Sequence, residues 1–234
     1  MNKKEFRENM AAVNAIVSDT MLEQYIKYAS LLKTWNEKMN LSAITEEEEV
    51  FTLHFYDSIL GFAKIPNRED IKTFADVGAG AGFPSLPIKI VFPHLEITII
   101  EPLAKRCTFL KEVVKELGLE NVNIVNARAE DFALEHRESF DLVSARAVAN
   151  LNMLSELCIP LVKEHGLFMA MKGSSGMQEN EAAKDALRTL GVKLENVCEE
   201  HVGEHTHINL YYRKIAKTPK KYPRAFAKIK KNPL

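Results

Sequence analysis

The stretch DVGAGAGFP at residues 76–84 decides the fold of this chain. The run TFA at residues 73–75 leads into it and predicts a buried strand. Three alternating glycines then predict a tight turn, because glycine allows the backbone to approach a neighbour closely. Pro84 and Pro87 suit the first turn of a helix, where their missing N–H groups would have no partner. A strand, a glycine turn and a helix N-terminus together predict a site for a small anionic ligand.

The spacing of the glycines distinguishes between two kinds of cofactor-binding motif. Dinucleotide-binding proteins use the pattern G-x-G-x-x-G. This chain has G-x-G-x-G, and Phe83 occupies the place of the expected third glycine. The acidic Asp76 stands two positions before the first glycine, an arrangement that resembles the first motif of S-adenosylmethionine-dependent methyltransferases. A nicotinamide-dependent oxidoreductase is the alternative that this spacing speaks against.

Composition limits the classes of protein that remain. The chain has 234 residues, 46% of them hydrophobic, and a net charge of −1, so total charge does not indicate a partner. Residues 213–231 nevertheless hold nine Lys or Arg and no Asp or Glu. The cysteines at positions 107, 158 and 198 form no disulfide or zinc pattern, and we expect a cytoplasmic location. No apolar run approaches the ~18 residues that a membrane span needs.

Residues 1–65 are predicted to form a helical N-terminal extension. Phe6, Met10 and Val13 recur at helical spacing, and capping boxes are predicted at residues 20–23 and 45–48. The second box would open a helix that runs to Gly61. Its acidic residues are interpreted as a solvated first helical turn.

Strands alternate with helices from about residue 71. Five strands are predicted at residues 72–77, 95–100, 122–125, 140–144 and 167–171, with helices that open near Phe83, Pro102, Ala147 and Met177. This alternation predicts a parallel sheet covered on both faces. Residues 192–201 and 207–213 follow as an antiparallel hairpin. The pattern predicts an α/β Rossmann-like fold with a mostly parallel seven-stranded sheet, the class I methyltransferase layout, over residues 66–216. Residues 217–234 form a basic tail.

Ligands of open α/β sheets bind at the carboxyl ends of the strands. Glu101 ends the second strand and is expected to accept the ribose hydroxyls of a nucleoside, or else to cap the next helix. Glu130 or Asp131, after the third strand, could accept from an adenine amino group, although an acidic helix start explains them equally well. Arg146 ends the fourth strand and needs either a ligand or a structural salt bridge.

The residues at the end of the fourth strand also argue against two kinds of base methylation. It lacks the Asn/Asp-Pro-Pro-aromatic motif common in methylation of exocyclic base amines. It also lacks the cysteine nucleophile that C5 methylation of pyrimidines requires, since Cys158 lies within the following helix pattern. None of the histidines is a convincing base, and the catalytic residues stay unassigned. Guanine N7 would need no such machinery, because its lone pair is exposed in the neutral base.

With these residues together, the chain resembles the bacterial ribosomal RNA small-subunit methyltransferase G family, also called the glucose-inhibited division protein B family. The resemblance covers nearly the whole length. It rests on Trp35-Asn36, residues 40–44, 54–58, 76–84 and 101–106, Arg128-Ala129-Glu130, residues 146–149, 217–219 and 222–224, and Pro233-Leu234. The tail departs from the family pattern at Ala227 and Ile229, where a glycine and a proline are usual.

The resemblance implies methyl transfer from S-adenosylmethionine to N7 of a guanine in the decoding-region loop of 16S ribosomal RNA. Naked RNA or the assembled small subunit would be the substrate of a monomeric enzyme without a metal. Cofactor contacts are implied or expected at Gly78, Gly80, Phe83, Glu101, Ala129, Glu130 and Arg146. A non-catalytic RNA-binding or ribosome-assembly factor is the alternative, and it predicts a degraded cofactor site.

The basic tail suggests where RNA binds. Tyr222 and Phe226 alternate with positive charges, a pattern that suits phosphates and stacked bases. The alternative is a solubilising terminus. The predicted RNA-binding residues are Lys220, Lys221 and Arg224 in the tail, and Lys105, Arg106 and Lys172 near the carboxyl ends of the second and fifth strands.

Overall fold

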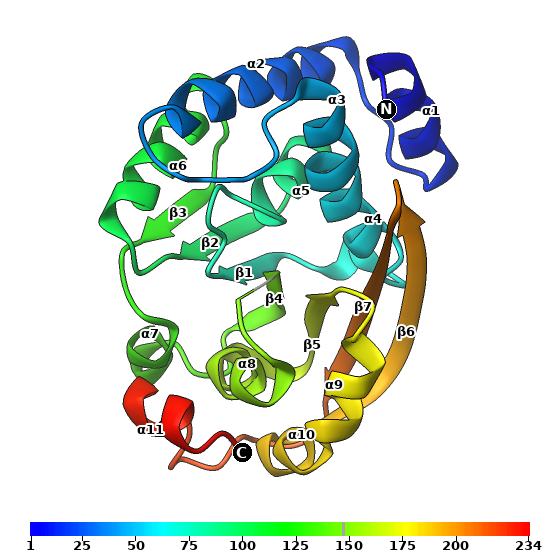
Figure 1. Cartoon of the computed structure of the whole chain (residues 1–234). Coiled ribbons are helices and arrows are strands. Elements are labelled where there is room, and N and C mark those ends of the chain that lie inside the picture. Colours follow the sequence, from blue (N-terminus) through cyan, green and yellow to red (C-terminus); the bar gives the residue numbers. More distant parts are fainter. Residues whose placement is uncertain (147) are drawn as a thin grey trace.

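The computed structural model describes residues 1–146 and 148–234 and is built around one seven-stranded sheet (Figure 1). The strand order is β3-β2-β1-β4-β5-β7-β6. β1 to β5 are parallel, whereas β7 is antiparallel to β5 and β6, so the predicted sheet and terminal hairpin are confirmed. The strands are β1 (Thr73–Val77), β2 (Glu96–Ile100), β3 (Val122–Val125), β4 (Phe140–Arg146), β5 (Val162–Lys172), β6 (Val192–Val202) and β7 (His205–Lys214).

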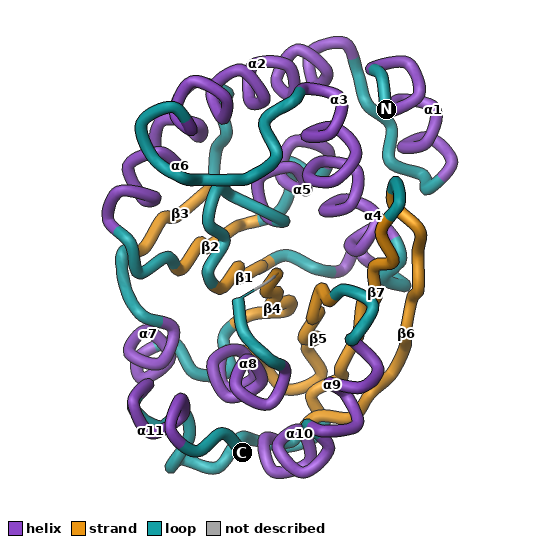
Figure 2. The backbone as a smooth tube through the Cα atoms, viewed as in Figure 1, coloured by secondary structure: helices purple, strands orange, loops and turns teal. Residues whose placement is uncertain are grey.

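Helices cover both faces of the sheet, because alternate residues of a strand point to opposite sides. In β1, Phe74 joins the core beneath the N-terminal helices, whereas Ala75 joins the core of the other face. One face carries α1 (Lys3–Ala12), α2 (Asp19–Asn36), α3 (Glu47–Glu49), the π-helix η1 (Val50–Tyr56), α4 (Asp57–Ala63), α5 (Ser85–Val91) and α6 (Ala104–Glu116) (Figure 2). The other carries α7 (Ala129–Glu135), α8 (Leu151–Cys158), α9 (Gly176–Ala182), α10 (Lys184–Leu190) and α11 (Phe226–Lys231). Short 3-10 turns η2 (Arg68–Asp70) and η3 (Ile159–Leu161) precede β1 and β5.

β5 begins earlier than its polar residues predicted. His165 has a φ of 64°, and the sheet register shifts opposite it between Phe140 and Leu142. A Cβ on Gly166 would lie 2.9 Å from the carbonyl oxygen of Asp141, so only glycine fits there. The start of β5 is polar and resembles a loop in the sequence. Because of this bulge, it still pairs as part of the strand.

Both predicted capping boxes are wrong. The N-cap of α2 is Ser18, whose hydroxyl accepts from the N–H of Met21 at 3.2 Å. Ser18 stands two residues before the predicted cap and already satisfies that turn. The N-cap of α3 is Glu46, which makes no side-chain capping bond. The helix opened by α3 then widens into η1 instead of continuing as a regular α-helix.

The predicted helix openings lie close to the observed ones except after β4. Helices begin at Ser85, Ala104 and Gly176, near the predictions. The fourth begins at Leu151, later than the prediction at Ala147, a residue outside the described part of the chain. None of the described helices has the length and apolar content of a bilayer crossing. The division of the chain into three segments stays a prediction.

The basic tail packs against the body instead of extending into solvent. Tyr222 and Ile229 are buried at 6% and 0% exposure, and Ile229 belongs to the helix α11. Arg137 donates to the carbonyl of Thr218 at 2.8 Å, which joins the tail to the loop before β4. Burial of Tyr222 removes it as a base-stacking residue, the role that its place among the cations suggested.

Candidate functional site

The glycine turn after β1 is held in a conformation that favours glycine. Gly78, Gly80 and Gly82 have φ angles of 70°, 60° and 96°. A Cβ on Gly78 would lie 2.9 Å from Val148, in the segment after β4. At Gly80 the nearest described atom to such a Cβ is Nη1 of Arg106, at 4.0 Å. The turn therefore packs tightly at its first glycine and is open beside its second, where a ligand can reach the main chain.

Glu101 connects the glycine turn to the end of β2. Its side chain is 1% exposed, and Oε2 accepts from the N–H of Gly80 at 3.1 Å. Oε1 accepts from the N–H of Leu103 at 3.0 Å, just before α6, and Arg106 lies 3.8 Å from Oε2. The carboxylate thus caps the next helix, as the structural alternative proposed. Its contact with ribose hydroxyls stays a prediction.

Asp76 holds the base of the same turn. Its carboxylate is fully buried and accepts from the N–H of Ser85 at 3.1 Å and from the hydroxyl of Ser144 at 3.4 Å. Burial raises the pKa of Asp76 to about 6. One side chain therefore ties β1 to the start of α5 and to β4.

The loop between β3 and α7 completes this edge of the sheet. Ala129 and Glu130 begin α7 at 8% and 6% exposure, and burial raises the pKa of Glu130. The amide of Asn126 donates to the carbonyls of Glu101 and Pro102, at 3.0 Å each, which fixes this loop against the end of β2. The residues predicted after β1, β2 and β3 therefore share one edge, because these three strands are neighbours in a parallel sheet. We call it the cofactor edge.

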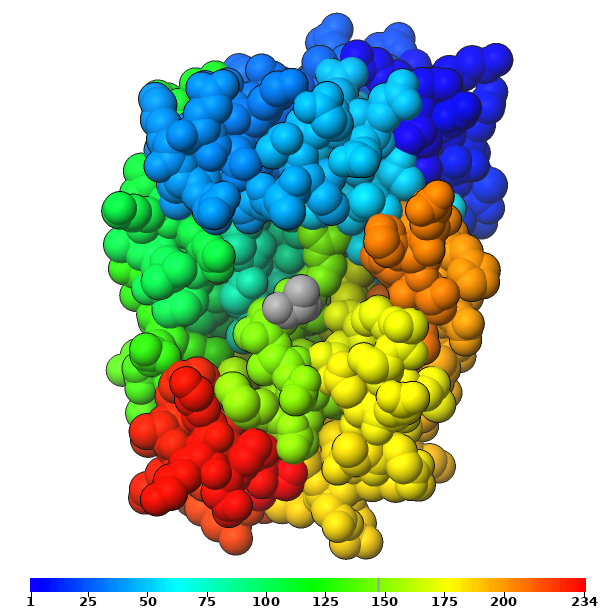
Figure 3. Space-filling view, viewed as in Figure 1, coloured from blue at the N-terminus to red at the C-terminus, as the bar shows by residue number. Residues whose placement is uncertain are grey.

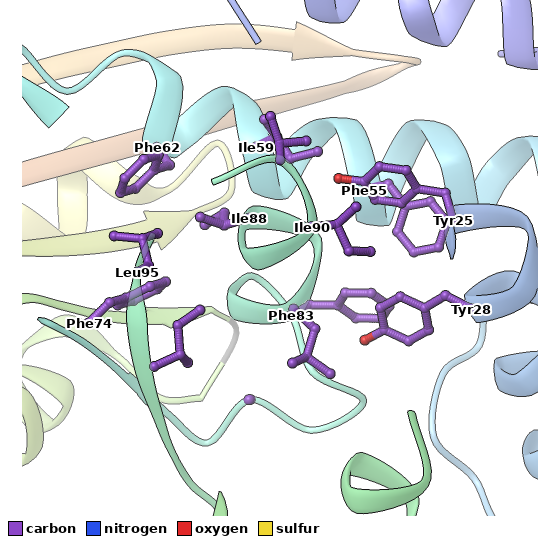
Figure 4. Close-up of a cluster of buried hydrophobic side chains, with 14 of the residues drawn as sticks. Tyr25, Tyr28, Phe55, Ile59, Phe62, Phe74, Phe83, Ile88, Ile90 and Leu95 are labelled. Atoms are coloured by element: carbon purple, nitrogen blue, oxygen red, sulfur yellow. The ribbon is translucent and has the colours of Figure 1, made fainter. Parts of the chain in front are cut away.

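Phe83 links the cofactor edge to the N-terminal helices. Its ring lies between Tyr28, at 5.6 Å between centroids, and His54, at 4.3 Å. Figure 4 shows Phe83 alongside Tyr28 in the buried cluster. The guanidinium of Arg146 lies 5.0 Å from the centre of the same ring. Phe83 and Arg146, which the family pattern places in the cofactor site, are thus in contact with each other.

Arg146 makes a structural salt bridge, one of the two alternatives that the sequence suggested for it. Its Nη1 donates to Oδ2 of Asp57 at 2.9 Å. The second carboxylate oxygen of Asp57 is bonded to Nδ1 of His207 at 2.5 Å. The Asp57 side chain is 2% exposed, so a buried carboxylate joins the end of β4 to the terminal hairpin.

His54 is held neutral in the same group. Its Nδ1 lies 3.1 Å from Nη2 of Arg146, and its Nε2 lies 2.8 Å from the hydroxyl of Ser42. Since arginine only donates, Nδ1 accepts and Nε2 carries the proton towards Ser42. Burial, together with the charge of Arg146, lowers the pKa of His54 to about 3.

The π-helix η1 positions these groups. Arg146 also donates to the carbonyl of Leu53 at 3.2 Å, so three successive contacts of η1 and α4, at Leu53, His54 and Asp57, converge on one guanidinium. Single π-turns of this kind are frequent at functional sites. The sequence alone does not predict a role for His54, Asp57, Ser42 or His207. The motifs at residues 40–44 and 54–58 were the available signal for the first three.

A pocket of about 460 Å³ opens beside this group of side chains. Figure 3 shows the N-terminal helices (blue), the hairpin (orange) and the α9 segment (yellow) meeting on this face. Apolar lining comes from Ile44, Leu53 and Met171. Polar lining comes from His54, Asp57, Arg146, Lys172, Glu179, His205, His207 and Asn209. We call these pocket-lining residues the acceptor edge.

The predicted RNA-binding residues fall into two groups. Lys105, Lys220 and Lys221 are exposed, and Arg106 is half-buried beside Glu101. Their positions leave these cations accessible from solvent. RNA contact by them stays a prediction.

Lys172 and Arg224 are already paired. Nζ of Lys172, in a side chain 6% exposed, lies 2.7 Å from both Glu179 and the carbonyl of Ala149. Arg224 is bonded to the buried carboxylate of Glu156 at 2.6 Å. The geometry therefore favours structural roles for these two cations over contact with phosphate.

Comparison with known proteins identifies relatives of the whole chain. A family model described as GidB, rRNA small subunit methyltransferase G, matches residues 21–209. Proteins named ribosomal RNA small subunit methyltransferase G are similar throughout: 48% identity in Bacillus subtilis, covering 100% of this chain and 99% of that protein, and 47% in Listeria monocytogenes, covering 96% and 95%.

Solved structures agree at the level of the fold. A SAM-dependent methyltransferase from Aquifex aeolicus superposes with a TM-score of 0.54 at 18% identity, covering 78% of this chain and 98% of that one. A 16S rRNA adenine-N1 methyltransferase from Catenulisporales acidiphilia, solved with SAM, gives a TM-score of 0.52 at 14% identity, covering 70% and 92%. The fold is that of the class I methyltransferases, and the chain belongs to the GidB family of rRNA small subunit methyltransferase G proteins.

Proposed function

We propose that this protein transfers the methyl group of S-adenosylmethionine to N7 of a guanine in the decoding-region loop of small-subunit ribosomal RNA. The observation that carries the proposal is the full-length similarity to rRNA small subunit methyltransferase G proteins. The proposed enzyme is cytoplasmic and acts as a monomer, with naked RNA or the assembled small subunit as its substrate.

The cofactor edge fits S-adenosylmethionine. The open main chain at Gly80 accommodates the methionine part, and Glu101, directly behind it, offers carboxylate oxygens to the ribose. Ala129 and Glu130 begin α7 on the far side, where an adenine would lie. Phe83 and Arg146 close the edge towards the pocket. When bound, S-adenosylmethionine supplies a methyl group on a cationic sulfur, which keeps the electron pair of the broken C–S bond.

The methyl acceptor then needs no general base. Neutral guanine carries a lone pair at N7, so its attack on the methyl carbon releases no proton from that atom. The chain's task is to exclude water and to orient the base. His54, neutral and buried at the acceptor edge, serves to position Arg146 and Phe83 in this scheme and not to move a proton.

RNA would be held by solvent-accessible cations at the start of α6 and in the tail. Lys105 and Arg106 stand at the start of α6, and Lys220 and Lys221 stand in the tail. Such cations attract phosphates without regard to sequence. Recognition of one guanine must therefore come from contacts with the base itself.

The test is methyl transfer from S-adenosylmethionine labelled at its methyl group. The purified protein is incubated with 16S RNA or with small subunits from a strain that lacks the gene, and N7-methylguanine is mapped by chemical cleavage. We expect labelling at one guanine of the decoding-region loop. RNA binding without transfer would support the non-catalytic assembly factor instead.

A further inference from the structure

The pocket at the acceptor edge lies directly beside the cofactor edge. Arg146 lines the pocket and also lies over the ring of Phe83. Lys172, on another wall, holds the carbonyl of Ala149, next to the Val148 that packs over Gly78. A planar group seated in this pocket would thus lie beside Arg146, whose guanidinium also lies over Phe83 of the cofactor edge.

The size and walls of the pocket suit one nucleobase. Its volume of about 460 Å³ lies within the range of small-molecule sites, roughly 300–1,000 Å³. Ile44, Leu53 and Met171 supply apolar surface for the faces of a ring. Enzymes that modify a base act on single-stranded substrate or extrude the base from a duplex into such a pocket.

Most polar groups of the pocket are already occupied by one another. Both oxygens of Asp57 are taken, by Arg146 and His207. Glu179 accepts from Lys172, from the N–H of Leu151 at 2.9 Å and from the hydroxyl of Ser175 at 3.1 Å. These groups shape the pocket but have little hydrogen-bonding capacity left for a ligand.

Asn209 and Lys172 are two of the lining groups with hydrogen-bonding capacity to spare. Asn209 is 1% exposed, and its side-chain oxygen has no hydrogen-bond partner among the described residues. Leaving a buried acceptor unpaired is unfavourable, so a ligand that donates to it gains affinity. The ammonium of Lys172 has three donors, of which Glu179 and the carbonyl of Ala149 use two. Nε2 of His207 and the ring of His205 also make no hydrogen bond among the described residues, but the Asn209 oxygen is the acceptor that is buried and unpaired. With the remaining N–H of Lys172 it offers one acceptor and one donor to a ligand.

This set matches the edge of guanine that lies beyond N7. We propose that the pocket receives the target guanine, with the Asn209 amide accepting from its N1–H and N2–H₂ edge and Lys172 donating to O6. The inference rests on the proposed function. Adenine would place an amino group against the lysine and a lone pair against the amide oxygen, so it would lose both bonds. Asn209 thereby acts as a specificity-determining residue, and Lys172 contacts the base and not a phosphate.

The experiment compares Asn209→Ala with wild type in the labelled methyl-transfer assay. We expect kcat/KM for the RNA to fall about 10- to 100-fold, as for loss of one buried hydrogen bond, with unchanged affinity for S-adenosylmethionine. Asn209→Asp keeps the acceptor oxygen and should recover most of the rate. The matched control is Asn180→Ala: this buried amide bonds Tyr212 at 2.8 Å outside the pocket, and its loss should leave kcat/KM unchanged.

A second measurement covers the case in which Asn209→Ala does not fold. Free GMP and AMP compete with the RNA for the wild-type protein, and GMP should inhibit at least tenfold more strongly. Equal inhibition by the two nucleotides, or an Asn209→Ala enzyme that binds cofactor and methylates at the wild-type rate, overturns the pocket assignment while the methyltransferase activity stands. Absence of methylation by the wild-type protein overturns the proposed function itself.

Discussion

The cofactor edge and the acceptor edge are built in different ways. At the cofactor edge, the glycine turn and Glu101 each follow a strand directly, and residues 129–130 follow β3 after a short loop. Main-chain N–H groups make several of the bonds. At the acceptor edge, Asp57 and His207 come from segments far apart in the sequence and meet only through side chains. A site made of strand ends can therefore be predicted from local sequence, whereas a site made of distant side chains needs the fold.

The largest effect is expected at the first glycine of the turn. Gly78→Val places a branched side chain at a φ of 70° and against Val148, so affinity for S-adenosylmethionine should fall more than 100-fold in isothermal titration. The control is Gly118→Val, which has a similar φ of 62° but no described atom within 4 Å. It should cost stability and leave cofactor affinity unchanged. Equal losses of cofactor affinity in both variants would show that backbone strain, and not the position of Gly78, causes the loss.

Breaking the central carboxylate should damage the acceptor edge most. Asp57→Asn removes the counter-charge of Arg146, and the free energy of unfolding should fall by about 3 kcal/mol, as for other half-broken buried pairs. Urea titration measures it. Asp185→Asn breaks an exposed pair with Arg188 and should cost less than ~1 kcal/mol. Similar costs for the two variants would show that the Asp57 pair is effectively solvated.

Glu101 tests how far the cofactor edge depends on one side chain. If Glu101 accepts the ribose hydroxyls as predicted, Glu101→Ala loses charge-assisted hydrogen bonds to the cofactor worth roughly 1.5–3 kcal/mol. We expect cofactor affinity to fall about 10- to 100-fold. A loss of less than threefold would assign Glu101 to helix capping alone.

His54 should make the contribution of the acceptor edge to the free energy of unfolding depend on pH. The pKa of His54 is about 3 in the fold, below its ordinary value of 6.5, so the unfolded chain binds a proton that the folded one refuses. The stability from His54 is present above pH 6.5 and is lost as pH falls towards 3. Between pH 6.5 and 5.5 wild type should lose about 1 kcal/mol more than His54→Gln in urea unfolding. Parallel losses would mean that His54 is protonated in the fold.

The smallest effect is expected from the tail lysines. Replacing Lys220 and Lys221 with Ala should lower the slope of log K against log salt by about 1.5 for the RNA, because two fewer phosphates are neutralised. Fluorescence anisotropy at several salt concentrations measures this slope. Arg224→Ala should instead lower the melting temperature, since it leaves the buried Glu156 unpaired. An unaltered slope after loss of both lysines would exclude the tail from the RNA interface.

The same contrast explains how much could be predicted. Strand order, the terminal hairpin and the cofactor edge follow from hydrophobic periodicity and from the residues after each strand. The bulge at His165 and the Ser18 cap could not be predicted, because the local sequence indicates something else at both places. The polar residues around His165 are typical of a loop, and a capping-box pattern stands just after Ser18. The pairing of Arg224 with Glu156 could not be predicted, since a basic run does not reveal which cations the fold will neutralise.

We propose that this chain methylates one guanine of small-subunit RNA through its cofactor edge. The most direct test maps N7-methylguanine in 16S RNA from a deletion strain carrying the wild-type chain, the Gly78→Val variant or the Gly118→Val variant. We predict modification of the decoding-region loop with wild type and Gly118→Val, and its absence with Gly78→Val. Full modification with Gly78→Val, or none with wild type, would contradict the account.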